Sequence, residues 1–272
     1  MPYPLSEVLA VAERLWPAAG AEGWDAPGLV SGAPGQSVSS IRLMVDAVAE
    51  SLDDAIAADV DLVIAHHPLL LRGVTSIAET HYKGAVLAKL IRSGTALLAA
   101  HTNADVVAAG TSAVLADKLG LAATRPIVPS AQPGTGIGRV GELPGAVSLG
   151  RLARTVADLL PATAGGVRVA GAFERQVLTV AVCGGAGDSL LSEQLVRDAD
   201  VYITADLRHH PASEAREQHL LGAGPALIDV SHWASEWLWL ETAAEQLRRA
   251  LPEASVTVSD IRTDPWDFAI VR

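Results

Sequence analysis

The sequence is poor in three features, and each scarcity excludes a class of protein. Cys183 is the single cysteine in 272 residues, so an internal disulfide framework is excluded and a reducing, cytoplasmic environment is expected. Lys and Arg number 20 against 31 Asp and Glu, for a formal net charge of −11. This balance argues against unspecific nucleic-acid binding, which depends on cationic side chains at phosphates. No apolar run reaches the roughly 18 residues that a membrane span needs.

The first residues, "MPYPLSEVLAVAERLWP", also lack the basic segment and the uniform apolar segment of a secretion signal. Their apolar residues recur at helical spacing behind Ser6, a candidate N-cap. The pattern predicts an amphipathic helix at the start of the chain.

Half of the residues are hydrophobic and 19% are charged, which is ample for a sizeable core. Strand-like and helix-like segments alternate along the chain, and this alternation is typical of βαβ units in an α/β fold with mixed sheets. We expect strands at 41–48, 61–65, 95–100, 166–171, 176–185, 199–206, 226–230 and 254–260. Helices are expected at 49–60, 83–94, 110–120, 148–160, 188–198, 211–221 and 234–251.

Two stretches rich in Pro and Gly interrupt this alternation, at 125–145 and 222–226. They predict two α/β domains. Residues 1–124 together with 225–272 would form one domain, and residues 125–224 the second domain. A ligand site is expected in a cleft at the carboxyl ends of the strands, where open α/β sheets bind ligands.

Histidines gather at these predicted strand ends. Six of the eight lie at or just past the end of a strand: His66, His67, His101, His209, His210 and His232. Carboxylates accompany them, with Asp105 four residues after His101 and Glu236 four residues after His232. Imidazole with carboxylate is the ligand set of Zn, Fe, Mn, Co or Ni. The pattern predicts a metal centre in this cleft, and the domain of residues 1–124 and 225–272 would be the metal-binding domain.

The adjacency of His66 and His67 indicates how many ions such a centre holds. Neighbouring strand residues point to opposite sides, so the pair suits two ions better than one. A carboxylate such as Glu236 has two oxygens and can bridge two ions, and metal pairs about 3.5–4 Å apart recur in hydrolytic enzymes. We therefore expect two divalent metal ions per chain.

Other polar residues have competing interpretations. A lone histidine at a strand end is usually a hydrogen-bonded structural residue, and we assign His81 and His219 to that class. His101 is expected to order its loop or to contact a bound ligand. Arg72, five residues past His67, and Arg208 are candidate contacts for an anionic substrate.

The segment "TADLRHHPASEA" is the least determined of these motifs. Asp206, His209 and His210 would be catalytic groups that contact substrate or transfer a proton. The alternative is that they are polar groups at the start of a helix.

The glycine-rich stretch "GIGRVG" is followed by Pro144 and opens no long helix, so we interpret it as a structural loop rather than a dinucleotide site. The stretch "TVAVCGGAGDSLL" does lead from strand to helix, and it predicts either a tight turn or a contact with an anion.

Together these motifs resemble one family. "HHPLLLRG", "HTNAD", "TADLRHH" and "DVSHWASE" are similar, in order and spacing, to the Nif-like dinuclear metal-binding family, the type 2 homologues of GTP cyclohydrolase I. The resemblance covers almost the whole chain. It implies two α/β domains, a two-metal site facing a cleft, and ring-shaped homo-oligomers, commonly hexamers.

Carried over position by position, the resemblance gives each ligand a role. His67 and Asp105 would hold one ion, His66 and His232 the other, and Glu236 would bridge the two. The sequence departs from the family pattern at Ala26-Pro27, where Asn-Val is usual, and at Ala205, where Gly is common.

Two functions of different classes follow. The first is a metal-dependent hydrolase of a nucleotide-like or other phosphorylated small molecule, since two divalent ions with two carboxylates leave a site that attracts anions. The second is a ring-forming metal-binding protein without catalysis, with a role in regulation, storage or metal delivery. Loss of activity with metal still bound, on replacing His209, His210 or Asp206, would favour the hydrolase.

Overall fold

The computed structural model describes residues 2–270, which divide into two compact units. Unit 1 comprises the chain up to Val107 together with Leu240–Thr263, and unit 2 comprises Ala108–Trp239 and the residues from Asp264 onward. Both are α/β units with mixed sheets, as the sequence predicts. Residues 108–124, 225–239 and 264–270, expected from the sequence in the first domain, belong to unit 2. For the first two segments the reason is that their strands pair within its sheet.

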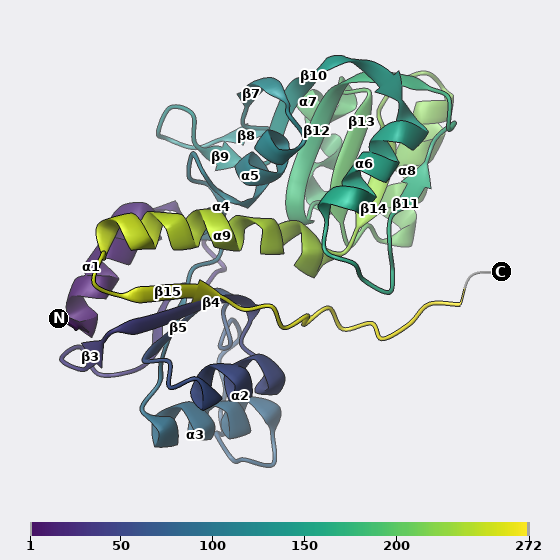
Figure 1. Ribbon diagram of the computed structural model, residues 1–272. Helices are drawn as coiled ribbons and strands as arrows, with labels where there is room; N and C mark the ends of the chain where they lie inside the picture. The colour runs from purple at the N-terminus through teal and green to yellow at the C-terminus, as the bar shows by residue number, and fades with distance from the viewer. Residues whose placement is uncertain (1, 271–272) are drawn as a thin grey trace. The chain divides into compact units, whose positions relative to one another are not determined.

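Unit 1 is built on a five-stranded sheet of order β15-β4-β5-β6-β2. Its strands are β2 (Gly28–Ser31), β4 (Ser40–Asp46), β5 (Leu62–His67), β6 (Ala96–Ala99) and β15 (Ser255–Val258). All neighbours pair in parallel except β2, which is antiparallel to β6. Helices α2 (Ala49–Ala57) and α3 (Tyr82–Ser93) lie on one face, and α1 (Leu5–Leu15) and the later turns of α9 (His232–Ala250) lie on the other (Figure 1).

The local chemistry explains these elements with one exception. Strand β5 is an apolar run whose side chains are buried up to His66, as expected for a strand covered on both faces. Helix α3 ends at Gly94, which takes the left-handed conformation that glycine adopts readily. Helix α1 differs from the prediction, because Pro4 rather than Ser6 occupies its N-cap position. Proline already has the backbone angle that a helix start needs.

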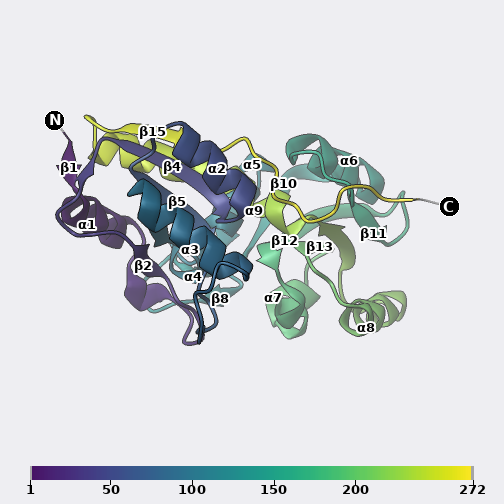
Figure 2. The same cartoon turned by 90° about the horizontal axis from the view of Figure 1, so that it is seen from below.

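Unit 2 contains a six-stranded sheet of order β11-β14-β13-β12-β10-β7. Its strands are β7 (Ala122–Arg125), β10 (Arg139–Ser148), β11 (Arg168–Ala170), β12 (Gln176–Ala186), β13 (Val201–Ala205) and β14 (Ala226–Val230). Strands β12, β13 and β14 are parallel and the other pairs antiparallel. Helix α6 (Leu149–Leu159) lies on one face, and α7 (Gln194–Arg197) and α8 (His209–Leu220) lie on the other (Figure 2).

The remaining elements are short. The helix expected at 188–198 is divided into the 3₁₀ turn η2 (Asp188–Ser192) and α7. "GIGRVG" lies across two strands rather than at a helix start, so it is structural as predicted. The other elements are β1 (Tyr3–Pro4), η1 (Ala18–Gly20), β3 (Ser37–Val38), α4 (Thr102–Asp105), α5 (Thr111–Lys118), β8 (Val128–Pro129) and β9 (Gly136–Ile137).

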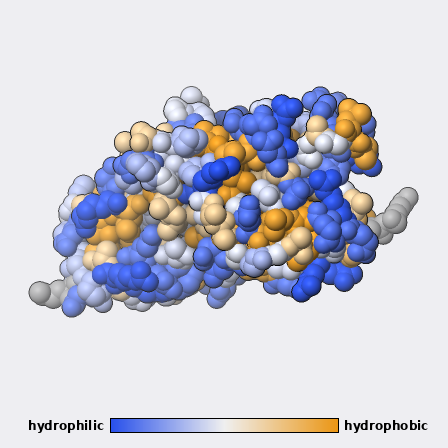
Figure 3. Space-filling model, turned by 90° about the horizontal axis from the view of Figure 1, so that it is seen from above, coloured by the Kyte–Doolittle hydropathy of each residue, from blue (hydrophilic) through white to orange (hydrophobic). Residues whose placement is uncertain are grey.

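The surface carries separate apolar patches between hydrophilic side chains on the face shown in Figure 3. Within residues 2–270, no helix combines the length and the apolar character needed to cross a membrane.

Candidate metal centre

Three histidines of unit 1 converge at the ends of two parallel strands. His66 and His67 end β5, and His101 follows the end of β6, the neighbouring strand. Each offers a ring nitrogen, and these atoms lie within 4.8 Å of one another. Ring centroids are 5.2 Å apart for His66–His67 and for His66–His101, and 5.5 Å apart for His67–His101. Three imidazoles at this spacing form a candidate divalent-metal site.

The Nδ1 atom of each ring makes a short hydrogen bond. The acceptors are the backbone oxygen of Ala100 for His66 (2.9 Å), Asp46 Oδ1 for His67 (2.7 Å) and Asp25 Oδ1 for His101 (2.8 Å). A ring that donates from Nδ1 carries its lone pair on Nε2 and is fixed in orientation. This arrangement, with carboxylates behind the imidazoles, is the usual support of metal-binding histidines.

Asp25 and His101 form the more enclosed of the two histidine–carboxylate pairs. The Asp25 side chain is fully buried and also accepts hydrogen bonds from the backbone N–H and the hydroxyl of Thr102. Burial raises the pKa of Asp25, but the hydrogen bonds from Thr102 and His101 outweigh it, so the pKa lies below its usual value. Burial lowers the pKa of His101, and the neighbouring His66 lowers it further. His101 is therefore neutral near pH 7, which is the state that binds a metal.

Asp105 adds an anionic oxygen to this cluster. It ends the short helix α4, directly after His101, and its Oδ1 lies 3.7 Å from Nε2 of His66. The sequence placed Asp105 among the ligands, and the structure brings it to the same strand ends as His66, His67 and His101. Imidazole nitrogens and one carboxylate are thus available within unit 1 alone.

Unit 2 carries a second cluster around the first turn of α9. Nε2 of His232 lies 2.9 Å from Oε1 of Glu236, one turn along the helix, and Nδ1 lies 2.7 Å from Oδ2 of Asp206. Burial lowers the pKa of His232, but the carboxylates of Glu236 and Asp206 outweigh it and raise the pKa to about 11. His232 and Glu236, four residues apart, thus share one face of the helix.

Gly185 gives this second cluster its space. Its backbone has φ +71°, and a Cβ built there would lie 2.3 Å from Oε1 of Glu236. Its N–H donates to Oγ of Ser235, 2.9 Å away. Cys183–Ala186 of the stretch "CGGAG" accordingly belong to β12 rather than to a tight turn, and an irregularity of the strand between Val182 and Ala186 lets the backbone approach the Glu236 carboxylate. Cys183, at the start of the stretch, is buried.

The other residues predicted from the sequence take different positions. Asp206 directly follows β13, has φ +55° and contacts His232 as described. The exposed Arg208 donates from Nε to Oδ2 of Asp188 at 2.5 Å. His209 and His210 begin α8 with ring centroids 5.3 Å apart, and His209 lines a hollow whose lining includes neither His232 nor Glu236. Arg72 is exposed in the loop after β5.

Asp25 and Asp46 are the functional candidates to which sequence reasoning gave no role. Asp46 ends β4 and is the register partner of His67 on the adjacent parallel strand, so its position at a strand end was a usable signal. Thr263 Oγ1 donates to its other oxygen at 2.5 Å. Asp25 lies in an irregular segment, and its 76-residue separation from His101 leaves no local pattern to detect.

Comparison with known proteins resolves which family this site belongs to. A model of the Duf34/NIF3 (NGG1p interacting factor 3) family matches residues 3–265. The chain belongs to the Duf34/NIF3 family. It is 46% identical over 269 residues to a protein of Streptomyces coelicolor named GTP cyclohydrolase 1 type 2 homolog, with 96% of this chain and 93% of that protein covered.

Other members of the Duf34/NIF3 family extend this likeness. A Mycobacterium leprae protein of the same name is 34% identical, with 98% of this chain and 96% of that protein covered. The solved structure of a Bacillus cereus protein related to NIF3 superposes with a TM-score of 0.90 at 22% identity, covering 99% of this chain and 100% of that chain. The family resemblance and the α/β fold predicted from the sequence are confirmed.

Proposed function

We propose that the chain is a dinuclear divalent-metal-binding protein and a metal-dependent hydrolase of a nucleotide-like or phosphorylated small molecule. The observation that carries the proposal is the convergence of His66, His67 and His101, each held from Nδ1 by an acceptor. The oriented set of imidazoles, of which His66 is fully buried, with Asp105 nearby suits a transition-metal dication. Names given to its relatives point to the same class of chemistry.

According to the family resemblance, both clusters would supply metal ligands. His67 and Asp105 would hold one ion, His66 and His232 the other, and Glu236 would bridge them. His101 would contact a ligand or complete the coordination. Bound divalent ions supply Lewis acidity and an activated water, and Asp46, Asp25 and Asp206 keep the imidazoles in the required tautomer.

A metal assay tests the centre directly. We would measure metal per chain by elemental mass spectrometry on untagged protein, with His66→Ala and Glu236→Ala beside it. The matched control is His219→Ala, whose ring contacts Gly224 and Arg175 instead of the clusters. We expect about two ions per chain in the wild type and the control, and a loss in both variants. Full metal content in Glu236→Ala would contradict the bridging role.

The hydrolase proposal needs a separate measurement, because a metal carrier would pass the first. His209→Ala and His210→Ala should keep their metal and lose about 10²-fold of turnover on phosphorylated small molecules, if these residues transfer protons. Arg72 and Arg208 would contribute to KM as contacts with the anionic substrate.

The competing proposal is a ring-forming metal-binding protein of the cytoplasm that regulates, stores or delivers metal. Such a protein would lose metal in His66→Ala and Glu236→Ala as the hydrolase does, keep it in His209→Ala and His210→Ala, and show no turnover of phosphorylated compounds even as the wild type.

A further inference from the structure

The last described residues form an extended segment whose large side chains are exposed. Trp266, Phe268 and Ile270 have 68%, 77% and 80% of their surface accessible. Spaced two residues apart, they point to one side of an extended chain, and Asp267 points to the other. This is the pattern of a strand with one buried face, yet the segment up to residue 270 joins no sheet. Exposed apolar groups of this size mark an interaction site.

Strand β11 of the same unit has an uncovered edge. It is the terminal strand of the six-stranded sheet and pairs, among the described residues, with β14 alone. The outer edge of such a strand presents backbone N–H and C=O groups that can pair with another strand.

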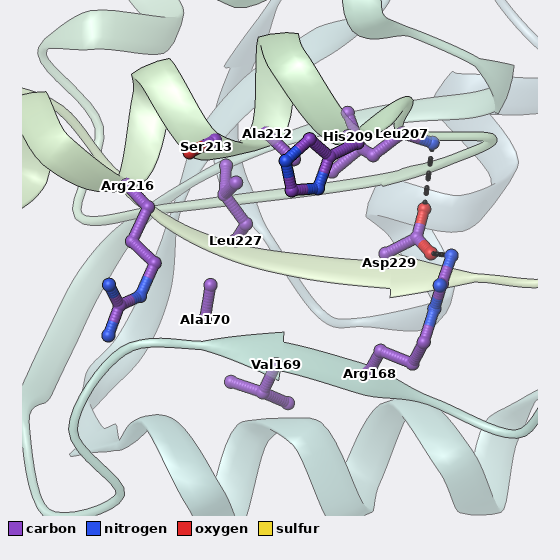
Figure 4. Close-up of a pocket in the computed structure, with 10 residues that line it drawn as sticks. All are labelled: Arg168, Val169, Ala170, Leu207, His209, Ala212, Ser213, Arg216, Leu227 and Asp229. Atoms are coloured by element: carbon purple, nitrogen blue, oxygen red, sulfur yellow. Dashed lines mark hydrogen bonds and ion pairs between the residues drawn. The ribbon is translucent and has the colours of Figure 1, made fainter.

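A hollow flanks β11 on each face of the sheet. The hollow beside α8, of about 430 Å³, has an apolar floor that includes Ala170 and Leu227, and it carries Arg168, His209 and Arg216 (Figure 4). The hollow beside α6, of about 320 Å³, is lined by Ala153, Ala157, Val169 and Phe173, with Arg154 over the Phe173 ring. In Figure 4 the Val169 side chain points away from Ala170, and Val169 lines both hollows.

We propose that Trp266–Ile270 of one chain adds as a strand to the edge of β11 in a second copy of the chain. Alternate side chains of an added strand enter the two hollows in turn. Phe268, with Trp266, would cover Val169 in the hollow beside α6. Asp267 would enter the other hollow, where Arg216 supplies complementary charge.

The second copy is the occupant because every chain carries both halves of the contact. Oγ of Ser231 donates a hydrogen bond to Asp264 at 2.6 Å. The described residues that follow Asp264 pair with no strand, and their apolar side chains are exposed. Val169 and Phe173 of the same chain are also exposed, at 42% and 52%. A donor segment and an acceptor edge on different surfaces make a head-to-tail contact, which closes into a ring or continues as a filament.

Disulfide trapping tests the contact and identifies the donor. In a Cys183→Ser background, Val169→Cys and Phe268→Cys proteins are mixed and mildly oxidised. We expect a cross-linked dimer on a denaturing gel. Phe268→Cys mixed with Ile91→Cys, which is 64% exposed on α3, reports cross-linking by random collision. No dimer above that control would overturn the proposal, and so would a cross-link that forms only within one chain when Val169→Cys and Phe268→Cys are placed on the same chain.

Association strength gives an independent measurement. By analytical ultracentrifugation, Trp266→Ala should weaken self-association about tenfold or more, as for a buried aromatic anchor. Leu221→Ala, at a residue 79% exposed after α8, is the matched control and should leave it unchanged. Asp267→Arg should weaken association and Arg216→Asp should restore it in the double variant. Equal association of Trp266→Ala and wild type would refute the docking.

Discussion

Strand β5 of unit 1 and strand β13 of unit 2 each begin after an aspartate that clamps the neighbouring parallel strand. Asp61 Oδ2 accepts from the backbone N–H and the hydroxyl of both Ser39 and Ser40, at 2.8–3.0 Å. Asp200 Oδ2 accepts from the backbone N–H of Leu178 and Thr179, both at 2.9 Å. The same local device therefore fixes the register of two parallel strand pairs far apart in the sequence.

The opposite ends of these strands differ. Strand β5 continues into His66 and His67, and His66 is fully buried. Strand β13 stops at Ala205, and its cluster is built from Asp206 and from His232 on α9, with side chains 60% and 29% exposed. Unit 1 thus holds its candidate ligands within the sheet edge, whereas unit 2 supplies them from a loop and a helix start. Both arrangements are compatible with an α/β sheet, because functional side chains can come from the strand ends themselves or from the loops and helices that follow them.

The largest expected effect is the loss of stability when a core side chain is truncated, and it can be compared between the two units. Leu97→Ala in β6 and Ile203→Ala in β13 replace fully buried side chains, and each should lower the free energy of unfolding by about 2–5 kcal/mol. Ile91→Ala, at an exposed position, should change it by less than about 0.5 kcal/mol. Denaturant unfolding monitored by circular dichroism measures all three. A small effect in one unit alone would show that its core is loosely packed.

The next largest effect is the loss of metal affinity when a carboxylate that accepts a hydrogen bond from a histidine is removed. Asp46→Ala should weaken metal affinity by about 10–100-fold, because His67 loses the acceptor that orients it. Asp206→Ala should lie at the lower end of this range, since its carboxylate is 60% exposed, against 26% for Asp46. Competition with a chromogenic chelator measures both affinities. A larger loss of affinity in Asp206→Ala than in Asp46→Ala would contradict the expectation that the less exposed carboxylate contributes more.

A smaller difference in unfolding free energy is expected between Asp61 and Asp200, the two aspartates that bind the neighbouring strand. Asp61→Asn should cost about 1–2 kcal/mol of unfolding free energy and Asp200→Asn about 1 kcal/mol, since Asp61 accepts more bonds. Burial raises the pKa of Asp61, but the bonds from Ser39 and Ser40 outweigh it and lower the pKa below 3.8.

The sign of the pH dependence follows from this lowered pKa. Its contribution is complete above pH 3.8 and is lost as the pH falls through the lower pKa of the folded state. The stability gap between wild type and Asp61→Asn, measured by urea titration, should therefore close at acid pH. A gap that persisted there would exclude the charge as its source.

The smallest effect concerns backbone strain. Asp59 and Asp206 have φ of 51° and 55°, a region that costs residues with a Cβ about 1–2 kcal/mol. Asp59→Gly should raise the unfolding free energy by about 0.5 kcal/mol after the extra entropy of glycine. Asp206→Gly should lower it, because the contact with His232 is lost. Thermal unfolding compares the two, and stabilisation by both would show that this contact contributes little.

Much of the fold and part of the candidate site could be predicted from the sequence. Period-two and period-3.6 patterns located most of the longer elements, and the strand ends located His66, His67 and His101. The identification of Asp105 and Glu236 depended on their four-residue spacing. Asp25 and Asp46 received no role, because their partners are set by pairing across the sheet rather than by local spacing.

The division of the chain into two units could likewise be predicted only in part from the sequence. Pro- and Gly-rich stretches mark turns, yet the stretch from 125 to 145 runs into β10, inside a sheet. Which strands share a sheet depends on hydrogen bonds between distant segments, such as β7 with β10.

The sequence by itself determined the α/β alternation, the chemistry of the side chains and their location at strand ends, because these follow from local periodicity. Only the tertiary structure decided that Asp46 supports His67, that Gly185 leaves room for Glu236, and that β11 is an edge strand. Each of these depends on which segments, remote in sequence, become neighbours when the sheets form.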